Sequence, residues 1–201
     1  MHLDRLIGLD QQITLAINSM HSPFTDAIWK FFSSIPVWIP MYAIVAACLF
    51  WRLGWKRGLL FTIVLGLMVL FCDQFANLIK NSVQRLRPCR DAAMMAAGLH
   101  APRIGSAFGF FSGHAANTFG FAAASTVALR TDRRLRYRGY IAWIYIWCTL
   151  VSLSRVFLGM HYFGDITAGA IAGTAIGLAL AYLGRYAAGR LAYGPQASPQ
   201  Q

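Results

Sequence analysis

Long apolar runs dominate the chain, and short polar or basic segments separate them. Five runs are candidate membrane spans: Ile35–Trp51, Leu59–Ile79, Ala115–Leu129, Tyr140–Leu153 and Phe163–Leu183. A helix that crosses a bilayer needs about 20 apolar residues. The third and fourth runs are shorter, so we expect each to continue into polar sequence at one end. The pattern predicts an all-α, polytopic membrane helix bundle of about five to six spans.

The first twenty residues carry a weaker, amphipathic pattern. The apolar residues that share one face are Leu3, Leu6, Ile7, Ile13 and Ile17. Polar residues interrupt this pattern too often for a span, so we interpret it as an N-terminal helix lying in the membrane interface. No apolar run precedes a small-residue cleavage site, so we expect the segment to be retained. We predict one domain over 1–201, with the interfacial helix and a connector in 1–30, a transmembrane core in 35–183 and a cytoplasmic tail in 184–201.

Composition and charge agree with a membrane protein. Apolar residues make up 57% of the chain and charged residues only 12%, too few for a fully hydrated surface. The net charge of +11 is concentrated in short loops, one with Arg52, Lys56 and Arg57 and one with Arg130, Arg133, Arg134, Arg136 and Arg138. Short basic loops between apolar runs are typical of cytoplasmic loops, and we therefore expect no nucleic-acid partner. The four cysteines show neither metal-type spacing nor a disulfide framework.

This topology places the segments 80–112 and 155–162 on the outer face of the membrane. The first of them nevertheless carries five basic residues: Lys80, Arg85, Arg87, Arg90 and Arg103. Charges at membrane helix ends are costly unless they are paired or used. A basic outer loop therefore needs a functional explanation.

Three polar clusters mark the outer ends of the spans. They are Lys80 with Arg87, Ser112-Gly113-His114, and Arg155 with His161 and Asp165. Each cluster alone has a structural explanation. Lys80 and Arg87 could be interfacial anchors, and Ser112 could be a helix N-cap. Arg155 could cap a helix C-terminus, and His161 and Asp165 could be a hydrogen-bonded pair four residues apart. Together, on one face, they suit a phosphate, because cations and helix N-termini bind its oxygens and two histidines offer a nucleophile and an acid. No second carboxylate accompanies Asp165, so a two-metal hydrolase is poorly supported, and we expect no metal or organic cofactor.

The strings Lys80-x6-Arg87-Pro88, Ser112-Gly113-His114 and Ser154-Arg155-x5-His161-x3-Asp165 resemble the three-part signature of the type 2 phosphatidic acid phosphatase (PAP2) superfamily, in its membrane lipid phosphatase branch. The resemblance implies a helical core with an active site on the periplasmic or extracellular face of a bacterial cell membrane. It also implies that His161 is phosphorylated, that Asp165 orients it and that His114 protonates the leaving oxygen. The implied phosphate-binding residues are Lys80, Arg87, Ser112, Gly113 and Arg155.

Several residues near these strings have two possible roles. The family has Pro before Ser-Gly-His where this chain has Phe111, and the loss of a fixed φ should loosen that loop. Aromatic residues around it could line the path of a lipid tail or simply pack: Phe108, Phe110, Phe111 and Phe119. Asp73 and Asn77 could position Lys80 or form an interhelical hydrogen bond. His100 and Arg103 could touch a headgroup.

The resulting prediction is a lipid phosphate or diphosphate phosphatase that acts through a phosphohistidine. Among substrates we rank undecaprenyl diphosphate first, then phosphatidylglycerophosphate and phosphatidic acid, and then a lipid A phosphate. The alternatives are a lipid phosphotransferase with the same intermediate and a non-enzymatic lipid transporter. We expect the lipid substrate to come from the bilayer and no obligate protein partner.

Overall fold

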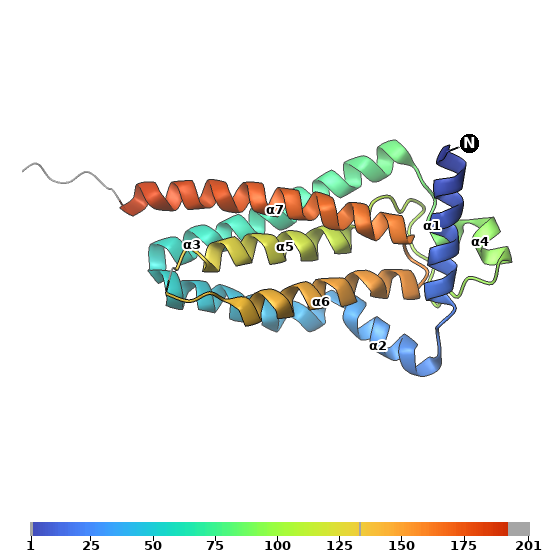
Figure 1. Ribbon diagram of the computed structural model, residues 1–201, viewed down its shortest axis with the longest axis horizontal. Coiled ribbons are helices and arrows are strands. Elements are labelled where there is room, and N and C mark those ends of the chain that lie inside the picture. Colours follow the sequence, from blue (N-terminus) through green and yellow to red (C-terminus); the bar gives the residue numbers. More distant parts are fainter. Residues whose placement is uncertain (1, 133, 193–201) are drawn as a thin grey trace, which may run out of the picture.

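The computed structural model describes residues 2–132 and 134–192, and over this part of the chain the secondary structure is helical, with no strand. The helices are α1 (His2–Asn18), α2 (Pro23–Ser33), α3 (Ile35–Val83), α4 (Ala92–Ala96), α5 (Gly113–Leu129), α6 (Arg138–Phe157) and α7 (Phe163–Ala192). Helices α3, α5, α6 and α7 run alongside one another, and α1 lies across one end of this bundle (Figure 1). The predicted all-α membrane bundle is confirmed.

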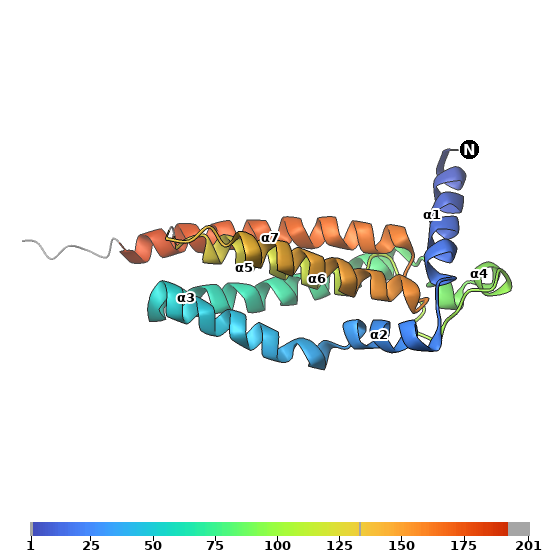
Figure 2. The same ribbon diagram turned by 60° about the horizontal axis from the view of Figure 1, so that its bottom comes forward.

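Helix α3 consists of two arms that fold back on each other (Figure 2). The predicted basic loop with Arg52, Lys56 and Arg57 is reduced to a sharp turn at Gly54, whose φ of 77° and ψ of 170° are far from helical. Beyond the turn the arms are in close contact, because a Cβ atom on Gly58 would lie 2.7 Å from the Cα of Phe50. In the described part of the chain, α3, α6 and α7 are long and apolar enough to cross a membrane. Helix α5 has 17 residues, about 25 Å at 1.5 Å per residue.

The ends of several elements differ from the sequence-based expectation. Helix α7 continues to Ala192, so the first part of the predicted tail is helical, and 193–201 lie outside the described residues. Helix α2 begins in the predicted connector and continues to Ser33, beyond the predicted boundary at residue 30. Its start carries a recognisable signal: the Ser22 hydroxyl accepts from the Thr25 N–H, Thr25 Oγ1 accepts from the Ser22 N–H, and Pro23 occupies the first turn.

Helices α5 and α7 pack through their backbones. A Cβ atom on Gly169 would lie 2.5 Å from the Ser112 carbonyl oxygen. Added Cβ atoms on Gly173 and Gly177 would overlap the backbone of α5 even more severely. Small residues at four-residue spacing allow such close approach in membrane helices, and the stripe is a packing face, as the spacing indicates.

The two basic loops meet at the end of the bundle opposite to α1. Arg52 donates two hydrogen bonds to one carboxylate oxygen of Asp132, at 2.9 Å and 2.5 Å, and the Tyr137 hydroxyl donates to the same oxygen at 2.9 Å. This ion pair connects the turn of α3 to the segment between α5 and α6. The clusters 80–112 and 155–165 lie at the other end.

We expect Gly173→Ala to lower the free energy of unfolding by about 1–3 kcal/mol, because its methyl group would be forced against the α5 backbone. Gly189→Ala on the same helix is the matched control, since nothing lies within 4 Å of a Cβ atom there. Thermal unfolding in detergent should show a lower midpoint for the first variant and an unchanged or slightly higher one for the second. Equal midpoints would contradict the packing argument.

Candidate active site

The three polar clusters converge at the end of the bundle that α1 covers. The Ser112 N–H donates to the Asp165 carbonyl oxygen at 3.0 Å, which joins the start of α5 to the start of α7. A Cβ atom on Gly113 would lie 3.6 Å from Lys80 Nζ, so the last turn of α3 reaches the same point. Segments from three distant parts of the chain therefore form one site.

His161 lies at the centre of this site, and only 2% of its surface is exposed. Its Nε2 is 3.0 Å from Arg87 Nη1, and its Nδ1 is 3.4 Å from Asp165 Oδ2. Because a guanidinium group can only donate, Nε2 must be the accepting nitrogen. The hydrogen-bond network therefore assigns the proton to Nδ1, facing Asp165, and leaves a lone pair on Nε2.

The surroundings of His161 favour its neutral form. Burial lowers the pKa of His161 well below its usual value, and the nearby cations of Arg87, Arg155 and Lys80 lower this pKa further. At neutral pH the imidazole is therefore uncharged. An uncharged imidazole with a free Nε2 lone pair is the form that can act as a nucleophile.

The Asp165 carboxylate is fully buried and accepts hydrogen bonds from two donors besides His161. Its Oδ2 accepts from the Tyr162 N–H at 3.1 Å, and its Oδ1 accepts from Arg85 Nη1 at 2.9 Å. The other arm of Arg85 donates to Asp10 Oδ2 at 2.7 Å, and Asp10 Oδ1 accepts from the Gly164 N–H at 2.6 Å. The charges thus alternate along a chain that begins on α1 and ends at His161.

Sequence reasoning did not include Arg85 and Asp10 in the site. Arg85 was counted only as part of a basic loop, and Asp10 only as a polar interruption in the amphipathic helix. The two are 75 residues apart, and no spacing rule connects an N-terminal helix to that loop. The available signals were the two acidic residues of that helix, Asp4 and Asp10, and the excess of arginines in the outer loop.

The remaining cations and His114 border the same space. Arg87 Nη1 also donates to the Met160 carbonyl at 3.0 Å, and Arg87 Nη2 donates to Ser106 Oγ at 3.1 Å. Arg155 donates to the Ser33 hydroxyl, and His114 hydrogen-bonds the Ser33 backbone. The Nε groups of Arg87 and Arg155 are buried without a hydrogen-bond partner. Buried donors of this kind usually have a partner, and an anion would supply one.

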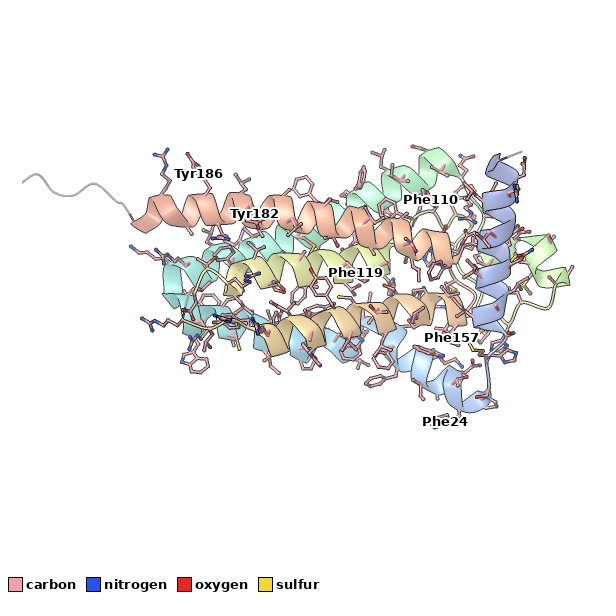
Figure 3. The ribbon with its side chains drawn as sticks, in the orientation of Figure 1. Phe24, Phe110, Phe119, Phe157, Tyr182 and Tyr186 are labelled. Atoms are coloured by element: carbon pink, nitrogen blue, oxygen red, sulfur yellow. The ribbon has the colours of Figure 1, made fainter. Side chains whose placement is uncertain are left out.

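Neighbouring residues separate into site and packing roles. Ser112 caps α5, with its hydroxyl accepting from the Ala115 N–H at 3.4 Å. Asp73 accepts from Asn117 at 2.7 Å, which is the interhelical hydrogen bond considered from sequence. Phe111 is buried, whereas Phe110 borders an apolar cavity beside α1. In Figure 3, Phe119 lies within the length of the bundle and Phe110 near the end covered by α1.

Two further observations concern ligands. In the described part of the chain, no three His, Cys, Asp or Glu side chains lie close enough together to hold a metal ion. His100 pairs with Asp26 at 2.8 Å and stacks on His21, with ring centres 3.8 Å apart. His100 therefore fixes α2 against the outer loop.

Comparison with known proteins shows the family of the chain. A family model described as the PAP2 superfamily matches residues 55–188. The chain belongs to the PAP2 superfamily.

Two curated relatives of this PAP2 protein are named lipid A 4'-phosphatase. The one from Bacteroides thetaiotaomicron is 35% identical over 174 residues, which cover 85% of this chain and 75% of the relative. The one from Porphyromonas gingivalis is 27% identical over 178 residues, which cover 87% and 72%. The fold is similar to the crystal structure of a transmembrane PAP2-type phosphatidylglycerolphosphate phosphatase from Bacillus subtilis, with a TM-score of 0.64 and 21% identity over 93% of this chain and 88% of that one. The protein is an integral membrane phosphatase.

We expect His161 to remain neutral at pH 6, where an exposed histidine is mostly protonated. Because its pKa is lowered, protonation should require a more acidic pH, and Arg87→Gln should raise the pKa by removing one neighbouring cation. Nitrogen-15 NMR of labelled histidines in detergent, with His161→Gln to assign the signal, should report an Nδ1–H tautomer. A titration midpoint at or above about 6.5 would contradict this account.

We expect Arg85→Gln to lower kcat about 10- to 100-fold, as is typical when a residue that orients a catalytic ligand is lost, with little change in KM. Arg85 positions Asp165, because both arms of its guanidinium donate to carboxylates, one to Asp165 and one to Asp10. Arg90→Gln is the matched control, because Arg90 lies in the same outer loop and its side chain donates to the Gly105 carbonyl, away from Asp165. Steady-state kinetics on both variants, after checking their unfolding midpoints, test this role. An unchanged kcat in Arg85→Gln would refute it.

Proposed function

We propose that this PAP2 protein removes phosphate from a membrane lipid through a phosphohistidine on His161, without a metal. The observation that carries the proposal is the Nε2 atom of a buried, neutral His161, held by Asp165 and bordered by Arg87 and Arg155. Lys80, Ser112 and the Gly113 N–H lie at the same point and complete a set of donors for phosphoryl oxygens. Such donors stabilise the charge that develops during phosphoryl transfer.

The reaction proceeds in two displacements. The lone pair on His161 Nε2 attacks phosphorus while the bond to the lipid oxygen breaks and His114 donates a proton to that oxygen. Water then attacks the phosphohistidine, His114 takes the proton from that water, and phosphate leaves with His161 restored. Asp165 holds the Nδ1 proton in both steps and stabilises the positive charge on the ring.

Arg87 has to change partner when the substrate binds. One of its N–H groups now donates to Nε2, the atom that attacks. A phosphoryl group against Nε2 would offer oxygens to this N–H and to the unpaired Nε of Arg87. Arg87 therefore first orients the His161 ring by donating to Nε2 and then binds the phosphoryl group.

An apolar cavity provides a route for the lipid tail. It has a volume of about 460 Å³ and lies between the two arms of α3 and α5. Its lining includes Tyr42, Leu65, Val69 and Phe121, and it reaches His114 at the polar end. A lipid whose ester oxygen lies against His114 would extend its chain along this cavity, within the depth of the bilayer.

A lipid A phosphate becomes the first candidate substrate, because both curated relatives are named for it. It moves ahead of undecaprenyl diphosphate, phosphatidylglycerophosphate and phosphatidic acid. The basic loops at the opposite end of the bundle support an exoplasmic position for the site, since such loops stay in the cytoplasm. This position faces the periplasm in a bacterial inner membrane.

The test is phosphate release by purified protein in detergent with EDTA, using these four lipids. We expect release by the wild type, none above background by His161→Ala, and a loss of about 10²- to 10⁴-fold in His114→Asn. Labelled phosphate should be trapped on the wild-type protein in a form stable to base and labile to acid.

Loss of activity with EDTA, or equal release by wild type and His161→Ala, would overturn the mechanism. Release that requires an added lipid or sugar hydroxyl would favour the phosphotransferase alternative. Lys56→Gln, at the opposite end of the bundle, controls for the handling of the variants.

A further inference from the structure

A third cavity, of about 460 Å³, lies beside the site, and its lining includes three basic residues, Lys30, Arg103 and Arg155. Lys30 and Arg103 are exposed, and Arg155 is buried with 9% of its surface accessible. Ser33 and Ser34 add hydroxyl groups to the wall, and no acidic side chain is among the described residues that line it. The proposed hydrolysis does not use Lys30 or Arg103.

The basic cavity lies next to His114, the residue proposed to protonate the leaving oxygen. Ser33 belongs to its wall, accepts a hydrogen bond from Arg155 and presents its backbone to His114. Two residues further on, Ile35 lines the apolar cavity that also reaches His114. The junction between α2 and α3 therefore separates an apolar cavity from a basic one, and both adjoin the acid that would protonate the leaving oxygen.

The basic cavity is also connected to the phosphoryl-binding cluster. Arg155 is shared by the two, and its buried Nε has no hydrogen-bond partner. Met160, another wall residue, accepts from Arg87 through its carbonyl. A ligand that fills the basic cavity thus lies next to a phosphate on His161 but on the leaving-group side.

We propose that the basic cavity binds a second phosphate group carried by the leaving-group part of the substrate. This inference rests on the proposed function and narrows its substrates to lipids with two phosphate groups, whether joined in a diphosphate or borne at separate positions. Two exposed cations at the mouth and a buried guanidinium at the base suit a dianion. A leaving group that carries no phosphate would leave these charges unpaired.

The test compares lipids that differ only in the second phosphate. The pairs are undecaprenyl diphosphate with the monophosphate, and bisphosphorylated lipid A with its 4'-monophosphate. For Arg103→Gln and Lys30→Gln we expect kcat/KM for the bisphosphorylated member to fall about tenfold each, as for the loss of one charged hydrogen bond. The monophosphorylated member should change less than about twofold. The pair that shows the effect identifies the spacing of the two phosphates.

Lys56→Gln removes the same charge at the far end of the bundle and should leave both rates unchanged. Equal losses on both members of each pair, or no loss on either, would overturn the second-phosphate subsite. Failure of the hydrolytic proposal would look different, because no lipid would then be cleaved in a His161-dependent way. Lys30 and Arg103 are both exposed, so both variants should fold, and their unfolding midpoints are measured to check this.

Discussion

The close backbone contact between α5 and α7 is the constraint on which the site depends. Helices with ordinary side chains pack 8–10 Å apart, and at that distance the turn before α5 could not reach the start of α7. Glycines at 169, 173 and 177 remove the obstacle, and the Ser112 N–H then bonds directly to the Asp165 carbonyl. This contact places the helix that carries the proposed acid against the helix that holds the carboxylate partner of the proposed nucleophile.

Charge balance explains why the site needs α1. Lys80, Arg87 and Arg155 surround a neutral imidazole, and the nearby counter-charges are the buried Asp165 and, beside Lys80, Asp73. A fully buried carboxylate is costly unless it is hydrogen-bonded and paired. Arg85 supplies the pair, and Asp10 on α1 in turn pairs the second arm of Arg85. The interfacial helix is therefore part of the electrostatics of the site.

The amino-acid sequence was sufficient for the helical class, the family and the meeting of the three clusters, because those depend on apolar periodicity and fixed motif spacing. It was not sufficient for the sharp turn inside α3. The hydropathy pattern around Gly54 is the same whether the polypeptide turns at one residue or through a seven-residue loop. Helix α2 was missed because its eleven residues are too few to show a span-like run. Asp10 and Arg85 were missed because their contact is tertiary and follows no local rule.

The bonds from α1 to α7 also determine when the site can form during synthesis. Asp10 accepts from Gly164, which lies 154 positions later, and Thr14 accepts from Phe163, 149 positions later. Helix α1, which is synthesised first, can therefore form these hydrogen bonds only after α7 has been inserted into the bilayer. Contacts between such distant parts of a chain form late in folding. A chain that stops short of α7 would display its basic outer loop without an ordered His161, so unfinished copies would be unable to consume lipid phosphates.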